Sequence, residues 1–177
     1  MVKRRADSPF KSSWHVATAA EAIAAAQFSR LGFNVAVQYG ANQPEYDLMI
    51  ADEHRMLKIS VKGSADGGWG LTQSLLSNAN YHAAADKWMS RHKPHTALCF
   101  VQFVGVEFDA MPRVYLARPL EVSNRLKSAS GGRGDTILYE NYTRGPRASG
   151  AGTIERIPKS WQLSAKRILD VMKEAAV

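Results

Sequence analysis

The segment PEYDLMIADEHRMLKISVKG, residues 44–63, decides the fold of this 177-residue chain. Residues 46–51 and 55–62 form two short runs in which apolar side chains dominate or alternate with polar ones, a pattern typical of β-strands. A polar connection of hairpin length, residues 52–54, joins the two runs. The segment therefore predicts two neighbouring strands of one sheet.

Polar side chains on these two strands converge on one side of the sheet. Because successive side chains of a strand alternate between its faces, Glu45 and Asp47 share one face of the first strand, and Ser60 and Lys62 share one face of the second. Hydrolysis of a phosphodiester needs a divalent ion to polarise the phosphoryl oxygen and activate a water, and a cation near the transferring oxygens. Asp47 and Lys62 are of these two chemical types. The alternative is an edge-strand charge at Asp47 and a solvated strand-end lysine at Lys62.

Further helices and strands on either side of the hairpin complete a predicted core. Small and apolar residues at helical spacing predict a helix at 16–31, which Gly32 ends and whose alanines let it pack close to a sheet. The other core elements expected are a strand at 33–38, a glycine-rich loop at 63–70, a helix at 78–91 and a buried strand at 95–104. The predicted order is α-β-β-β-α-β.

The last third of the chain is expected to elaborate the same domain. It is basic and contains two glycine-rich stretches, at 128–134 and 145–152. The elements expected there are a strand at 113–117, a helix at 119–126, a strand-like run at 136–140 and a basic helix at 164–175. We therefore expect one domain over residues 1–177, with its core at about 16–104 and a basic C-terminal elaboration at about 105–177.

The predicted order, with an acid in the first helix, Asp47 on a strand and Lys62 ending the next strand, resembles the PD-(D/E)xK nuclease superfamily. The resemblance covers about residues 16–104 and is strongest to the Holliday-junction-resolvase-like and homing-endonuclease-like branches. It implies a restriction-endonuclease-like α/β core, with a mixed central sheet flanked by helices. It also implies Mg²⁺ or Mn²⁺ bound by Asp47, by Glu21 of the helix and by the carbonyl of Val61, with Lys62 as the catalytic lysine.

Ser60 departs from this pattern, because the position two before Lys62 carries an acid or an amide in the superfamily. A hydroxyl is a poor replacement for a carboxylate on magnesium, so Ser60 would contact a metal-bound water while Glu45 or Glu21 supplies the missing charge. Glu21 has a second interpretation, since Thr18 to Glu21 fits a capping box at a helix start. The function expected is metal-dependent hydrolysis of DNA. The alternative is a module that kept the fold and binds nucleic acid without cleaving it.

The charge of the chain favours a polyanionic partner, because lysines and arginines that neutralise phosphates release condensed counterions. The formal net charge is +7 and the pI is about 9.7. The residues expected to contact DNA, in duplex or branched form, are Trp69, Gln73, Lys87, Arg133, Arg144 and Arg147. Trp69 has an alternative role as a buried anchor of its loop, and the others as solvated surface residues.

Composition excludes several other classes of protein. Cys99 is the single cysteine, which excludes disulfides within the chain and cysteine-ligated zinc. No apolar run approaches the roughly 20 residues of a membrane-spanning helix. The first residues are basic without a following apolar segment, unlike a secretion signal, so we expect a cytoplasmic protein. Nucleases that cut both strands often act as dimers, and we expect a homodimer.

Overall fold

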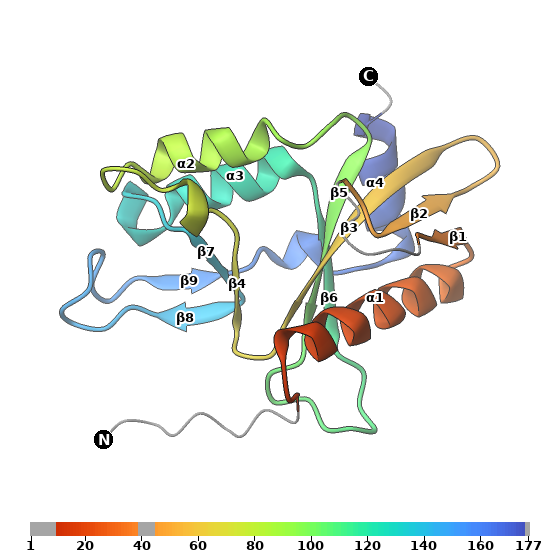
Figure 1. The fold of residues 1–177 in the computed structure, drawn as a ribbon, viewed down its shortest axis with the longest axis horizontal. Helices are drawn as coiled ribbons and strands as arrows, with labels where there is room; N and C mark the ends of the chain where they lie inside the picture. Colours follow the sequence, from red (N-terminus) through yellow and green to blue (C-terminus); the bar gives the residue numbers. More distant parts are fainter. Residues whose placement is uncertain (1–9, 39–44, 176–177) are drawn as a thin grey trace.

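The order of elements in the computed structural model, which describes residues 10–38 and 45–175, confirms the predicted core (Figure 1). A short strand, β4, lies between the third core strand and the second core helix. The core elements are α1 (Ser13–Arg30), β1 (Asn34–Val37), β2 (Leu48–Ala51), β3 (Met56–Ser64), β4 (Gly68–Gly70), α2 (Tyr81–Met89) and β5 (Thr96–Gln102). The turn expected around residues 40–44 lies outside the described residues.

The central sheet has five strands in the order β1-β2-β3-β5-β6, where β6 is Arg113–Ala117. All neighbours are antiparallel except β3 and β5, which run parallel, so the sheet is mixed as expected. In the predicted hairpin, Leu48 lies opposite Ile59. The α/β class with a mixed central sheet is therefore confirmed.

Helices cover both faces of this sheet (Figure 1). Helices α1 and α4 (Ala165–Ala175) pack with the buried side chains of β2 and β3 in one core cluster. Helices α2 and α3 (Pro119–Ser128) pack with Leu98 and Phe100 of β5 in a second cluster on the other face. In the described part of the chain, no helix is both long and apolar enough to cross a membrane.

Helix α1 approaches β3 closely at Gly63. A Cβ atom at Gly63 would lie 2.8 Å from the carbonyl oxygen of Val16 and 2.9 Å from the Cβ of Ala20. Ala20 and Ala24 are fully buried against the sheet, so small side chains on α1 and a missing one on β3 together bring the two backbones into contact. This contact sets the position of Glu21, the residue after Ala20.

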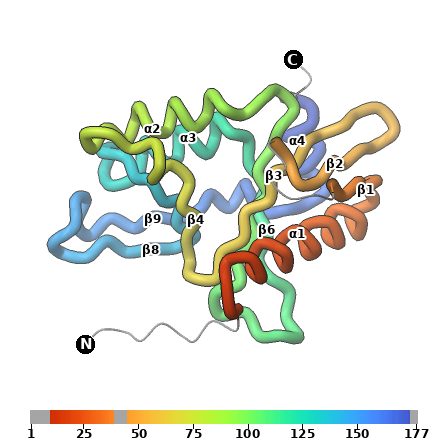
Figure 2. Tube along the Cα trace, viewed as in Figure 1, coloured from red at the N-terminus to blue at the C-terminus, as the bar shows by residue number. Residues whose placement is uncertain are grey.

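The C-terminal elaboration, whose segments β8 and β9 run side by side in Figure 2, contains pairings that the sequence patterns did not indicate. Part of the expected glycine-rich loop at 63–70 is β-structure instead: β3 continues to Ser64, and β4 pairs with β7 (Ile137–Tyr139). Two further strands, β8 (Asn141–Thr143) and β9 (Ile154–Arg156), form a separate antiparallel pair. The remaining elements are the short helical turns η1 (Gln73–Leu75), η2 (Ser130–Gly132) and η3 (Lys159–Trp161).

Candidate active site

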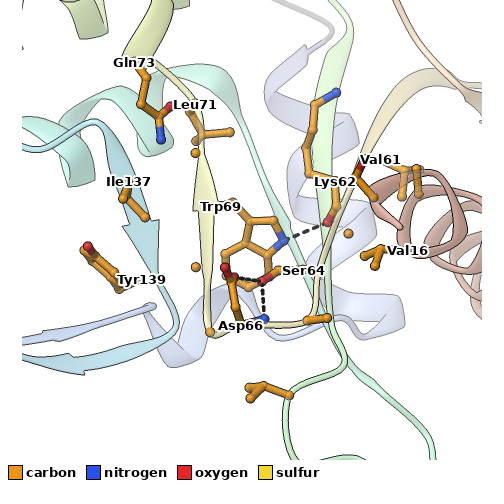
Figure 3. A pocket seen from close by; sticks show the side chains of 18 of the residues that line it. Val16, Val61, Lys62, Ser64, Asp66, Trp69, Leu71, Gln73, Ile137 and Tyr139 are labelled. Atoms are coloured by element: carbon orange, nitrogen blue, oxygen red, sulfur yellow. Dashed lines mark hydrogen bonds between the residues drawn. The ribbon is translucent and has the colours of Figure 1, made fainter. Parts of the chain in front are cut away.

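A groove of about 1120 Å³ runs along the end of β3 (Figure 3). Helix α1 forms one wall, and β4, β7 and β8 form the other. Four of the residues expected to bind the metal or to act in catalysis line this groove together: Glu21, Asp47, Val61 and Lys62. They come from three separate segments, so it is the fold that brings the two acids and the lysine together.

Asp47 is fixed to β3 by hydrogen bonds from its backbone and its side chain. The backbone N–H of Asp47 donates to the Ile59 carbonyl at 2.8 Å. The Asp47 carboxylate accepts, through Oδ2, the N–H of Val61 at 2.6 Å. Among the described residues, the Val61 N–H is the hydrogen-bond donor to this carboxylate. The other oxygen, Oδ1, is therefore left for a further ligand in the groove.

The carbonyl of Val61 lies on the same edge of β3 as Asp47. In a strand the N–H and C=O of one residue point to the same neighbour, and the N–H of Val61 points to Asp47. The pairing of β2 with β3 runs from Met56 to Ile59 and ends before Val61. The Val61 carbonyl therefore faces the space beyond the start of β2, next to the Asp47 carboxylate.

Glu21 lies in the interior of α1, not at its start. The helix begins at Ser13, and the side chain of Ser12 accepts the N–H of His15 as the N-cap. The capping-box interpretation of Glu21 is therefore wrong, because the helix extends further toward the N-terminus than the sequence pattern indicated. The Glu21 carboxyl, partly buried in the groove wall, has a pKa raised above 4.5, first by burial and then by the negative charge of Asp47, while the positive charge of Lys62 lowers it.

Lys62 is exposed at the groove, and its backbone is held from the opposite wall. The indole Nε1–H of Trp69 donates to the Lys62 carbonyl at 2.9 Å (Figure 3). Trp69 is only 3% exposed, and its ring meets Phe100 edge-on at a centroid distance of 5.1 Å. A ring this buried offers no face for a base, so the structure favours the anchoring role of Trp69 over the stacking role.

Glu45 and Ser60 lie outside the set of residues that line the groove. The carboxylate of Glu45 pairs with Lys58 at 3.3 Å and with Lys93. Hydrogen bonds from Lys93 and Lys58 lower the pKa of Glu45. Ser60 is 8% exposed, buried within β3. Two acids were expected to replace the carboxylate that Ser60 lacks. Glu21 lies in the groove, whereas Glu45 lies outside it and is already paired with two lysines.

The residues expected to contact DNA have different surroundings. Gln73 lines the groove. Lys87 and Arg147 are exposed, and the exposed Arg133 lies over the ring of Tyr81 at 5.1 Å. Arg144 is internal, because its guanidinium pairs with Asp135 and, at 2.9 Å, with Glu155. The structure thus gives Arg144 a structural role, which its position in a glycine-rich stretch did not reveal.

Sequence patterns did not identify several residues of the opposite wall. Tyr139, Asn141 and Tyr142 line the groove from β7 and β8. Their only signal in the sequence was the strand-like run at 136–140, which did not indicate that β7 pairs with β4 beside Lys62. Asp66, also in the groove, accepts the hydroxyl of Ser64 at 3.0 Å through Oδ1 (Figure 3).

The groove offers oxygen atoms of the kind that Mg²⁺ binds. Mg²⁺ commonly uses one or two carboxylates and completes its shell with waters and substrate phosphates. Asp47 and Glu21 supply two carboxylates, and Val61 adds a backbone carbonyl. Residues 10–38 and 45–175 contain no cluster of three or more histidine, cysteine or acidic side chains placed to hold a metal.

Comparison with known proteins gives one similar solved structure and no family. No family model matches the chain, and no curated protein matches it. The similar structure is that of a bacterial enzyme of the homing endonuclease class. It is I-Ssp6803I, which is 16% identical to this chain with a TM-score of 0.47, over 93% of this chain and 96% of that chain.

Proposed function

We propose that the protein is a DNA endonuclease that uses Mg²⁺ or Mn²⁺. The observation that carries the proposal is the groove at the end of β3, which brings Asp47, Glu21 and Lys62 together from three segments. Asp47, Glu21 and the Val61 carbonyl would hold the metal ion, whose chemistry is to polarise the phosphoryl oxygen and lower the pKa of a bound water. Glu21 comes from α1 and Lys62 from β3, and Asp47, just before β2, is hydrogen-bonded to β3, as a site that must position reacting atoms requires.

The electrostatics of the two acids support a cation between them. Burial raises the pKa of Glu21, and the negative charge of Asp47 raises it further because two nearby carboxylates repel each other. A divalent cation removes this repulsion. Lys62, the cation in the groove that the resemblance makes catalytic, would stabilise the attacking water or the negative charge that develops on the phosphoryl oxygens. The hydrogen bond from Trp69 fixes the backbone from which Lys62 extends.

DNA is the proposed substrate because the chain combines this site with a net charge of +7. Duplex or branched DNA would lie along the groove, with phosphate contacts from basic side chains that position it without reading sequence. A homodimer would place two such sites on the two strands, so we propose that cleavage of duplex DNA needs two copies of the chain.

Nicking of a supercoiled plasmid tests this proposal. The wild-type protein should convert supercoiled DNA to nicked or linear forms with Mg²⁺ or Mn²⁺, and should not do so in EDTA. Lys62→Ala should slow the conversion by at least about 100-fold, whereas Lys58→Ala, a matched change on the same strand outside the groove, should not. Metal-independent conversion, or equal loss in both variants, would contradict the proposal.

The second candidate function is binding of nucleic acid without cleavage, and Ser60 is the observation that favours it. A buried hydroxyl stands where the resemblance expects an acid, which leaves the metal with fewer charged ligands. If the site is only depleted, the wild type should still bind Mn²⁺ in isothermal titration calorimetry, and Asp47→Asn should weaken that binding. If the protein is a binding module, the wild type should bind duplex DNA in a salt-sensitive and metal-independent way and leave it uncut.

A further inference from the structure

The antiparallel pair of β8 and β9, which we call the ribbon, lies next to the groove. Asn141 and Tyr142 of β8 belong to the groove wall. Figure 1 shows the ribbon beside β4 and β7, and Figures 1 and 2 both show it extending away from the central sheet. A DNA segment bound along the groove would therefore meet the ribbon.

The two faces of the ribbon differ in character. Directly opposite residues share a face, and the pairs are Asn141 with Arg156, Tyr142 with Glu155, and Thr143 with Ile154. Glu155 is 4% exposed and faces the body of the protein, and Tyr142 on the same face stacks on Tyr139 at 4.4 Å although it is 39% exposed. The other face is exposed along its whole length and presents Asn141, Thr143, Ile154 and Arg156.

Buried ion pairs fix the orientation of this outer face. The Glu155 carboxylate accepts the Ser130 N–H at 2.7 Å, Arg144 Nε at 2.9 Å and Arg125 at 2.7 Å. Burial raises the pKa of Glu155, but these hydrogen bonds outweigh burial and lower the pKa to about 2. A two-stranded ribbon is marginally stable by itself, so these contacts hold it in one position relative to the groove.

The charge of the ribbon and its connecting loop fits a nucleic-acid partner. Residues 141–156 contain three arginines and one acid, Glu155. That acid is buried and paired, whereas Arg147 and Arg156 are exposed. The exposed charges of the ribbon are therefore positive, which is complementary to phosphate and not to a basic partner.

We propose that the outer face of the ribbon reads base edges in the major groove of duplex DNA. The major groove, about 12 Å wide, admits a two-stranded ribbon. The four exposed side chains are of the types that distinguish bases: arginine pairs with guanine, asparagine with adenine, and threonine or isoleucine contacts the thymine methyl group. This inference rests on the proposed function and gives it a sequence-reading element that begins at the groove wall with Asn141 and extends away from the two acids and Lys62.

Selection from a pool of duplexes with randomised positions tests the inference without cleavage. The full-length protein is incubated with the pool in EDTA, and bound duplexes are recovered and sequenced. Wild type should enrich a base pattern. Arg156→Ala and Asn141→Ala should each lower the preference at one or two positions by about tenfold, while affinity for unselected duplex falls only slightly. Arg30→Ala, an exposed arginine at the end of α1, is the matched control and should keep the wild-type pattern.

An unchanged pattern in both ribbon variants, or no enriched pattern with wild type, would overturn the inference. These results differ from a failure of the proposed function. If wild type selects a pattern that the ribbon variants lose, but never cuts the selected duplex with Mg²⁺ or Mn²⁺, the ribbon inference holds and the nuclease proposal fails. If wild type binds no duplex at all, both fail.

Discussion

Replacing Gly63 by alanine tests whether the contact between α1 and β3 positions the site. The new Cβ would lie 2.8 Å from the Val16 carbonyl oxygen, 2.9 Å from Val16 Cγ1 and 2.9 Å from Ala20 Cβ. Two of these three neighbours, the Val16 oxygen and Ala20 Cβ, belong to the helix backbone or are bonded to it, so no side-chain rotation relieves them. Helix α1 must therefore shift away from the sheet.

The size of the effect follows from this overlap. Inserting a methyl group into a well-packed interface costs about 1–3 kcal/mol. For a chain of this length, 2 kcal/mol corresponds to a fall of about 4–8 °C in Tm. Because Glu21 follows Ala20 on the same helix, a shift of roughly 1 Å would also misplace its carboxylate relative to Asp47 and lower the cleavage rate by about 100-fold.

Thermal unfolding and single-turnover cleavage on the same preparations measure both effects. Gly145→Ala is a matched control, because a Cβ there meets nothing within 4 Å and its φ is not in the left-handed region. That control should keep the wild-type cleavage rate, and its free energy of unfolding should rise by about 0.4–1 kcal/mol at most. If Gly63→Ala were as stable and as active as wild type, α1 would not pack this closely on β3, and our explanation for the position of Glu21 would be refuted.

Two further predictions concern the acids of the groove and the ribbon. Glu21 has a raised pKa in the folded state, so wild type loses stability as pH rises from 4.5 through that pKa. In EDTA at neutral pH, the Tm of Glu21→Gln should therefore be about 1–2 °C above that of wild type. Added Mg²⁺ should raise the Tm of the variant less than that of wild type. Equal Tm values for the two proteins in both conditions would contradict this. Glu155 has a pKa of about 2 in the folded state, so its contribution is complete above 4.5 and is lost as pH falls toward 2. Glu155→Gln should lower the free energy of unfolding in urea by about 2–3 kcal/mol at neutral pH. The variant should lose less stability in acid than wild type. An unchanged unfolding midpoint would contradict a stabilising role for the hydrogen bonds to Glu155.

The core could be predicted from the sequence because its signals are local. The hairpin and helix α1 each lie within one short segment. Side-chain periodicity identified the two strands of the hairpin and the helix that contains Glu21. The boundaries differ by a few residues, as at Ser13, where the N-cap precedes the apolar pattern. Strand parity put Asp47 and Lys62 on one face, and both line the groove, but the same parity put Glu45 and Ser60 there and neither lines it. Asp47 also precedes β2, which begins at Leu48.

Contacts between distant segments could not be predicted in this way. Lys93 neutralises Glu45, and Arg144 pairs with Glu155 inside the protein. A lysine or arginine in a loop has the same local sequence signature whether it meets solvent, a phosphate or a carboxylate far along the chain. Trp69 is a similar case, because glycines around an aromatic residue fit both an exposed stacking loop and the buried edge strand that the structure contains.

The most direct test of the cleavage site compares Asp47→Asn with Glu45→Gln in single-turnover cleavage of duplex DNA with Mg²⁺. The two acids are two residues apart, but only Asp47 lines the groove, while Glu45 pairs with lysines. Asp47→Asn should lower the rate by at least about 100-fold, and Glu45→Gln should keep it within about threefold of wild type. Equal losses in the two variants, or a larger loss in Glu45→Gln, would contradict the site that we propose.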